Sequence, residues 1–163
     1  MTFSSEKERE VLNLESRRKV YRLVQQFSGC NFHHLERASN IPAGTLRYHL
    51  HYLAKHGLVI VHKDGNKIRY FTQQVASHDR HLLSLLRQKH IRHLLLFILN
   101  HKQRSQHDIV QFLGLSPSTV SWYLSRLVGK KILTVHVKER ESYYRLAVSE
   151  SSILSLLLTY KES

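Results

Sequence analysis

The sequence predicts a mostly α-helical protein with small β-hairpins, an α+β fold made of two similar modules in tandem, residues 1–75 and 76–163. The first reason is an internal repeat, because a shift of 74 residues aligns 17–72 with 91–146 without a gap. Apolar character is kept at the matched positions although few residues are identical. The second reason is a hydrophobic content of 42%, which allows packed cores.

Three helices are expected in the first copy, over about 16–27, 32–38 and 43–56. The second helix is expected to bury Leu35 and Ala38. The first helix is indicated by apolar residues at the i, i+3, i+4, i+7 spacing that forms one face of a helix. These residues are Val20, Leu23, Val24 and Phe27.

A β-hairpin is expected after the third helix. Gly57 suits the left-handed position that ends a helix, and the runs 58–62 and 67–72 are predicted strands. The turn between them lies at 64–66, where the sequence Asp-Gly-Asn is typical of a tight hairpin.

The second copy repeats this order. Its helices are expected over about 89–100, 106–113 and 117–129, and its strands over about 132–138 and 142–148. It departs from the first copy at Lys131, which stands where the first copy has Gly57. We therefore expect the chain to enter the second hairpin differently.

Three helices followed by a two-stranded hairpin form a winged helix-turn-helix module. The segments 41–50 (IPAGTLRYHL), 55–59 (KHGLV) and 115–124 (LSPSTVSWYL) resemble the DNA-binding domains of ArsR-like and MarR-like regulators. The whole chain resembles archaeal and bacterial proteins that carry two such modules. The resemblance implies a sequence-specific transcription regulator, expected to be a repressor, that binds double-stranded DNA through the third helix and wing of its first module.

Candidate DNA contacts in the first copy lie on the outer face of the third helix and beside the hairpin turn. Arg47 suits a guanine edge, and Thr45 suits a phosphate or a thymine methyl group. The alternative is that these side chains are only solvated. The helix candidates are Gly44, Thr45, Arg47, Tyr48, His51, Tyr52 and Lys55, and the wing candidates are Lys63, Lys67 and Arg69.

The second copy has fewer cations on the corresponding surfaces. Its helix candidates are Ser118, Thr119, Ser121, Trp122, Ser125 and Arg126, and its wing candidates are Lys138 and Arg140. Because Glu139 and Glu141 nearly cancel the wing charge, we expect the first copy to bind DNA more strongly. The second copy is expected to bind DNA weakly or to contact a partner protein. Trp122 is expected either on the outer face or packed inside the protein.

The charge balance favours a polyanionic partner. The chain carries 25 Lys and Arg against 12 Asp and Glu, a net charge of +13, and both halves are basic. Two rival functions remain open at this point. One is an architectural protein that coats DNA with little sequence preference, and the other is a protein-interaction adaptor that uses winged helices without reading bases.

Other chemistry has little support in the sequence. The thirteen histidines have no spacing that completes a metal site, so neither a metal nor another cofactor is expected. The lone cysteine, Cys30, is expected to be a buried structural thiol, with a redox switch as the alternative. No phosphate loop or nucleophile motif is present, so the protein is not expected to be an enzyme. Protonation of His51, His56 and His62 is expected to tighten DNA binding as the pH falls from about 7.5 to 6.

Helices with broad leucine-rich faces are expected at 79–86, in the linker, and at 149–160, near the C-terminus. They are expected either to pack on each other or to form a homodimer interface, since repressors of this kind pair to match two half-sites. No apolar run reaches the roughly 18–20 residues of a membrane span. Residues 1–10 are polar and lack the apolar region of a signal peptide, so a cytoplasmic, nucleoid-associated protein without membrane contact is expected.

Overall fold

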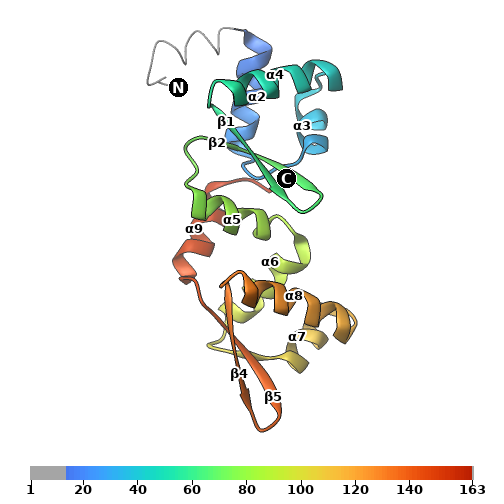
Figure 1. Ribbon diagram of the computed structural model, residues 1–163, viewed down its shortest axis with the longest axis vertical. Coiled ribbons are helices and arrows are strands. Elements are labelled where there is room, and N and C mark those ends of the chain that lie inside the picture. The colour runs from blue at the N-terminus through green and yellow to red at the C-terminus, as the bar shows by residue number, and fades with distance from the viewer. Residues whose placement is uncertain (1–13, 163) are drawn as a thin grey trace. The chain divides into compact units, whose positions relative to one another are not determined.

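The computed structural model describes residues 14–162, and the polar segment 1–10 therefore lies outside the described residues. The described chain divides into two compact units. One contains the residues up to Arg87 together with those from Leu157 onward, and the other contains Gln88–Leu156. Each unit combines helices with one β-hairpin (Figure 1), so the predicted fold class of two winged helix-turn-helix modules is confirmed.

The first module follows the predicted order of elements. These are α2 (Glu15–Gln26), α3 (Phe32–Ser39), α4 (Ala43–Lys55), β1 (Val59–Asp64) and β2 (Lys67–Thr72). Asn31 caps α3 by accepting a hydrogen bond from the backbone N–H of His34 at 2.9 Å. Asn40, at φ 57°, ends α3 in the left-handed conformation and turns the chain toward α4.

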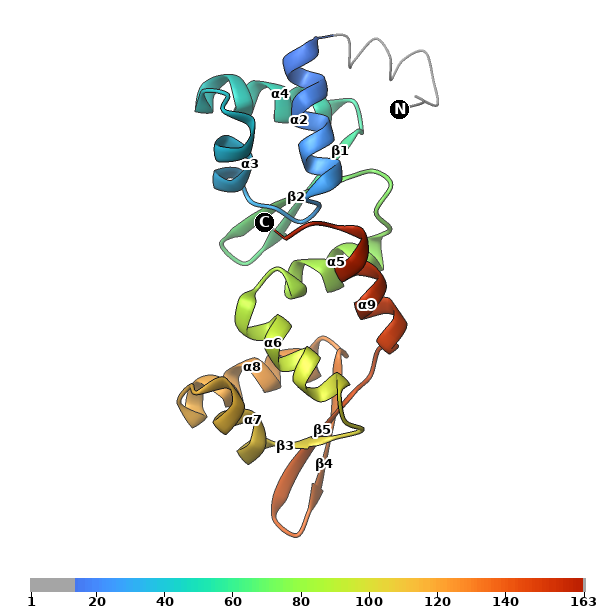
Figure 2. The ribbon, with the colours of Figure 1, turned by 180° about the vertical axis from the view of Figure 1, so that it is seen from behind.

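The second module repeats these elements. They are α6 (Lys89–Leu99), β3 (Arg104–Ser105), α7 (Gln106–Leu113), α8 (Pro117–Gly129), β4 (Leu133–Lys138) and β5 (Glu141–Leu146), followed by α9 (Glu150–Thr159). The helices α7 and α8 and both hairpin strands begin and end 74 residues after their counterparts in the first module. The internal repeat is therefore a structural repeat, and Figure 2 shows the second module from behind.

The two cores use matched positions. Leu46, Leu50 and Leu53 of α4 are buried, as are Val120, Leu124 and Leu127 of α8. The remaining matched pairs, all buried, are Val20 and Leu94, Tyr21 and Leu95, Val24 and Ile98, Leu35 and Ile109, Leu58 and Ile132, and Val59 and Leu133. Burying one such aliphatic side chain contributes about 1.5–3 kcal/mol, so this shared pattern favours the same fold twice. Ala38, expected in the core, is exposed, and Ser39 is buried in its place.

Each hairpin is closed by a two-residue turn, and each is joined by a short third strand segment that sequence reasoning missed. In the first wing Asp64 pairs with Lys67, and in the second Lys138 pairs with Glu141. The additional partner in the second module is β3, which pairs with β5 to give the order β3-β5-β4. In the first module it is a single bridge between Cys30 and Tyr70.

The entry into the second hairpin is the same as in the first, so the expectation of a different entry is wrong. Lys131 has φ 61° and Gly57 has φ 74°, which places both in the left-handed region at matched positions. The backbone N–H of the next residue bonds back to the helix in both cases, from Leu58 to Leu53 and from Ile132 to Leu127, at 2.9 Å. The lysine thus adopts a conformation that glycine adopts without strain.

The linker helix α5 (Ser77–Leu86) belongs to the first unit, whereas sequence analysis assigned it to the second module. The guanidinium of Arg87 donates two hydrogen bonds to the backbone oxygen of Ser28, at 2.9 and 2.6 Å. Gly29 has φ 85°, and a Cβ built there would lie 3.2 Å from Cγ of Arg87. This close approach holds the end of α5 against the loop between α2 and α3.

The last helix, α9, buries Ile153 and Leu156 and leaves Leu154 and Leu158 exposed. In α5 the apolar residues from Leu82 to Leu86 are buried within a single chain. None of the helices in the described part of the chain has the length and apolar run needed to span a bilayer.

Candidate nucleic-acid interface

The outer face of α4 is exposed along most of its length. Its backbone begins at Ala43, after Pro42, and its apolar face packs into the core of the first module. Tyr48 is 57% exposed although it is a large aromatic side chain, and Tyr52 one turn later is half-buried. The other predicted residues of this face are all exposed: Gly44, Thr45, Arg47, His51 and Lys55. The face predicted from the sequence is therefore brought together on one side of α4.

Aromatic side chains form a continuous row on this helix. The ring centroids of Tyr48 and Tyr52 lie 6.2 Å apart, and those of Tyr52 and His56 lie 4.5 Å apart. The guanidinium of Arg17, from α2, lies 3.7 Å from the centroid of the Tyr52 ring. This cation–π contact fixes the ring from the side of the module, because Arg17 is buried.

Arg47 does not point freely outward. Its guanidinium lies 4.6 Å from the centroid of the Phe32 ring on α3. Sequence reasoning expected Arg47 on a guanine edge, and in this conformation the cation instead lies over the neighbouring helix. The side chain remains exposed, so its charge still adds to the basic surface.

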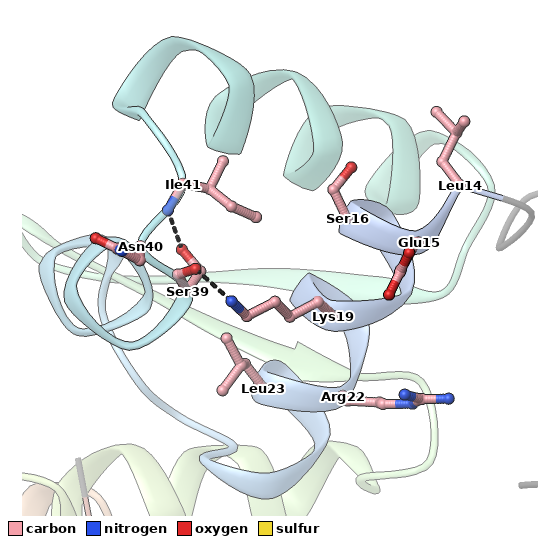
Figure 3. Close-up of a pocket in the computed structure, with 9 residues that line it drawn as sticks. All are labelled: Leu14, Glu15, Ser16, Lys19, Arg22, Leu23, Ser39, Asn40 and Ile41. Carbon is pink, nitrogen blue, oxygen red and sulfur yellow. Dashed lines mark hydrogen bonds between the residues drawn. The ribbon is translucent and has the colours of Figure 1, made fainter.

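The turn that leads from α3 into α4 is joined to α2 by a hydrogen bond (Figure 3). Lys19 donates a hydrogen bond from Nζ to the backbone oxygen of Ser39 at 2.7 Å, and the Ser39 hydroxyl accepts one from the N–H of Ile41 at 3.2 Å. These bonds fix the turn between α3 and α4. Beside them lies an open cleft of about 820 Å³, lined by Leu14, Glu15, Ser16, Lys19, Arg22, Leu23, Ser39, Asn40 and Ile41.

A second contact from α2 reaches the inner side of α4. The hydroxyl of Ser16 lies 3.0 Å from Nε2 of His49, and this histidine is buried. Burial, and then the charge of Arg17, lower the pKa of His49 below its ordinary value of 6.5. His49 is therefore a neutral residue of the interface between α2 and α4, and it does not belong to the outer face.

The first wing carries fewer outward cations than the sequence suggested. Lys63 and Lys67 are exposed on either side of the turn. Arg69 is only 6% exposed, and its guanidinium donates a hydrogen bond to the backbone oxygen of Gly29 at 2.9 Å. The prediction that Arg69 contacts DNA from the wing is wrong, because β2 turns this side chain toward the loop after α2. Burial accordingly lowers the pKa of Arg69.

The three histidines whose protonation was expected to tighten DNA binding, His51, His56 and His62, do not lie on one face. His51 is exposed on α4 and His56 is half-buried at its end. His62 lies on β1, with its ring 6.0 Å from Phe71 and 4.9 Å from His81 between centroids. It is therefore packed against other parts of the first unit and is not on the outer face of α4.

In the second module, α8 has an exposed and mostly uncharged outer face. Trp122 is 57% exposed, with the guanidinium of Arg126 5.4 Å from its ring, so of the two placements that the sequence left open the structure shows the outer face. Ser118, Thr119 and Ser125 are exposed. Ser121 departs from the expected pattern, because it is half-buried and accepts a hydrogen bond from Gln106 at 3.3 Å.

The second wing differs in chemistry from the first. Lys138 and Arg140 are exposed, as predicted, but β4 also exposes Val135 and Val137, the latter at 70%. Glu139 and Arg140 both have positive φ, 51° and 66°, which is the geometry of a tight hairpin turn. Both wings expose apolar side chains, since the first exposes Val61 and Ile68, and the second wing differs from the first in being closer to neutral.

Two further features concern metal-binding side chains and the thiol of Cys30. Among the described residues, no group of three or more His, Cys, Asp or Glu side chains lies close enough together to hold a metal ion. Cys30 is fully buried, and burial raises the pKa of its thiol to about 12. The thiol is thus protonated near neutral pH, which agrees with the predicted structural role.

The fold and the outward third helices define a protein with two helix-turn-helix domains in tandem. Residues 14–83 match a family described as an N-terminal HTH domain, and residues 87–134 match the family of winged helix-turn-helix DNA-binding domains. The chain is also 31% identical over 141 residues to a protein of Methanocaldococcus jannaschii named as the uncharacterized HTH-type transcriptional regulator MJ1398. The match covers 85% of this chain and 34% of that protein, so the chain spans about a third of the length of its curated relative.

Solved structures resemble the chain at a lower level. The antimony-specific transcriptional repressor AntR is 22% identical, with a TM-score of 0.46, and the match covers 52% of this chain and 79% of that one. A hypothetical protein from Pyrobaculum spherical virus is 20% identical, with a TM-score of 0.40, over 84% of this chain and 95% of that one.

Proposed function

We propose that the protein is a transcription regulator, acting as a repressor, that binds specific sites in double-stranded DNA through α4 and the first wing. The observation that supports this most directly is the exposed face of α4, together with the exposed Lys63 and Lys67 in the wing of the same module, in a chain with a net charge of +13. An α-helix of this kind fits the major groove, and lysines at a wing tip reach the phosphates beside it. Such a protein would act on the nucleoid, within the cytoplasm.

The proposed contacts are the candidate residues that are exposed or half-buried, which leaves out Arg69. In the first module they are Gly44, Thr45, Arg47, Tyr48, His51, Tyr52, Lys55, Lys63 and Lys67. In the second module they are Ser118, Thr119, Ser121, Trp122, Ser125, Arg126, Lys138 and Arg140. The lysines supply affinity independent of sequence, and the outer faces of α4 and α8 supply discrimination between sequences.

The test is recovery of bound fragments from genomic DNA, followed by titration of the recovered and random duplexes at several salt concentrations. A specific regulator is expected to bind its site at least about 10³-fold more tightly than random duplex. A steep dependence on salt without such discrimination would identify an architectural DNA-coating protein instead. Absence of binding to either duplex would favour a protein-interaction adaptor.

We also propose that two copies pair through α9. The apolar residues of α5 are already buried in one chain, whereas Leu158 of α9 is 86% exposed and Leu154, one turn earlier, is 41% exposed. Light scattering should give twice the mass of 19.2 kDa for the wild type and a single mass for Leu158→Lys. A monomeric wild type, or a variant that remains dimeric, would contradict this interface.

A further inference from the structure

The third helices of both modules expose one large aromatic side chain at the same place. Tyr48 on α4 and Trp122 on α8 are separated by the repeat shift of 74 residues, and both are 57% exposed. Thr45 and Thr119 precede them by three residues and are also exposed. Because residues i and i+3 share a helix face, each module has a threonine and an aromatic ring side by side.

These surroundings lack the side chains that read most base edges. Asn and Gln pair with adenine and Asp and Glu with cytosine, and neither α4 nor α8, both described throughout, contains any of the four. Arginine pairs with guanine, but Arg47 lies over Phe32 and Arg126 over Trp122. Besides the exposed His51 and Lys55 of α4 and the exposed Ser118 and Ser125 of α8, each face therefore holds an apolar spot formed by an aromatic ring and a threonine methyl group.

One feature of the major groove matches such a spot. The C5-methyl group of thymine is the apolar element of the base edges, and apolar side chains contact it. We propose that the pairs Thr45–Tyr48 and Thr119–Trp122 are specificity elements that bind the C5-methyl groups of pyrimidines in the major groove. The inference rests on the proposed DNA binding, and it names the feature of the DNA that the two modules read.

The rings are held in place before DNA arrives. Tyr48 lies 5.7 Å from the His49 ring and 6.2 Å from the Tyr52 ring, which in turn is covered by Arg17. Trp122 is flanked by Tyr123, at 5.2 Å between centroids in an edge-to-face arrangement, and by Arg126. Rings restrained in this way lose little conformational entropy on binding, which favours recognition of a group as small as one methyl.

The test uses two pairs of duplexes, and the two members of each pair differ only in methyl groups, so no knowledge of the natural site is needed. The first is an alternating A·T duplex, and the second has deoxyuridine in place of every thymidine. The third is a G·C duplex of equal length, and the fourth has 5-methylcytosine in place of cytosine. The dissociation constant of the full chain is measured for each at fixed salt.

The wild type is expected to bind the thymine duplex more tightly than the uracil duplex by about fourfold for each contacted methyl, the factor given by about 0.8 kcal/mol per buried carbon. Tyr48→Ser and Trp122→Ser should each reduce this ratio, while Tyr48→Phe, which keeps the ring, should retain it. Lys67→Met is the control, because loss of a phosphate contact should weaken binding to all four duplexes alike.

Trp122 provides a second measurement in the unmutated protein. It is the single tryptophan of the chain, so its fluorescence emission reports on this residue alone. Saturation with the thymine duplex should shift the emission to shorter wavelength more than saturation with the uracil duplex does.

The outcomes separate this inference from the proposed function. Tighter binding of both methylated duplexes supports recognition of the methyl group in either base, and a preference confined to thymine over uracil supports recognition of thymine in A·T pairs. Equal affinity for the thymine and uracil duplexes overturns the inference and leaves DNA binding intact. Failure to bind any of the four overturns both.

Discussion

Two cations on the first wing, Lys67 and Arg69, provide the sharpest test of the interface. They lie two residues apart on β2, and the sequence assigns them the same role. In the structure Lys67 is exposed beside the turn, whereas Arg69 is buried and bonds to the backbone oxygen of Gly29. Replacing each with methionine removes one charge and keeps an unbranched side chain of similar length, so the two variants form a matched pair.

Lys67→Met is expected to change the salt dependence of DNA binding, whereas Arg69→Met is expected to change the stability of the fold. Each phosphate contact contributes about 0.9 to the slope of log K against log salt, which amounts to about 3.5-fold in affinity between 50 and 200 mM salt. Lys67→Met should lower the slope by about that amount and leave the free energy of unfolding nearly unchanged. Arg69→Met should leave the slope unchanged and destabilise the protein by about 1.5–3 kcal/mol, because a buried hydrogen bond from a charged donor is lost.

The assays are titration of a labelled duplex by fluorescence anisotropy at four salt concentrations, and urea unfolding followed by circular dichroism. Titrations are run well below the unfolding midpoint of the less stable variant, so that both proteins are folded. A fall in salt slope for Arg69→Met equal to that for Lys67→Met would refute the assignment of Arg69 to the interior. An unchanged slope for Lys67→Met would remove the wing from the interface.

Two further predictions concern the fold. Lys131→Gly should stabilise the second module by about 1 kcal/mol, because the left-handed conformation strains a residue with a Cβ. For the same reason Gly57→Ala should destabilise the first module by a similar amount. Equal urea midpoints for Lys131→Gly and the wild type would contradict this reasoning. The free energy of unfolding should fall as the pH drops from about 7 to 5, because burial lowers the pKa of His34 and His49 in the folded state and the unfolded histidines, at 6.5, bind protons first. The free energy of unfolding is at its full value above pH 6.5, and His49→Gln should reduce the loss of stability below that pH. If the stability of His49→Gln depends on pH in the same way as that of the wild type, His49 does not contribute to the loss.

The sequence was sufficient for the fold because the repeat and the hydrophobic periodicity act on the same positions. Leu46, Leu50 and Leu53 recur as Val120, Leu124 and Leu127, and a helix that must bury such a face has one stable arrangement in each copy. The short strand segments were missed because they lack such a pattern. The bridge between Cys30 and Tyr70 depends on backbone groups brought together by the tertiary fold, and no side-chain pattern indicates it.

Surface positions were harder to predict because exposure depends on neighbours that are distant in the chain. The sequence places Arg69 on the wing because it lies close to the hairpin turn, but the backbone oxygen that it binds belongs to Gly29, 40 residues earlier. Arg47 was placed in the groove by helix phase, and only the packing of α3 shows that Phe32 draws its guanidinium aside. Lys131 was read as a departure because residue preference suggested it, whereas the packing of Ile132 and Leu133 imposes the left-handed turn.

The two modules share a core and differ in surface charge, and this separates affinity from discrimination. The first wing exposes Lys63 and Lys67, whereas on the second wing Glu139 and Glu141 nearly cancel the charges of Lys138 and Arg140. Contacts with phosphates weaken as salt rises, but burial of a methyl group against Tyr48 or Trp122 does not involve charge. If both surfaces bind DNA as proposed, raising the salt concentration should weaken binding to every duplex while the ratio between the thymine and uracil duplexes stays constant. A ratio that collapses together with the affinity would mean that the preference arises from electrostatics of the groove and not from contact with the methyl groups.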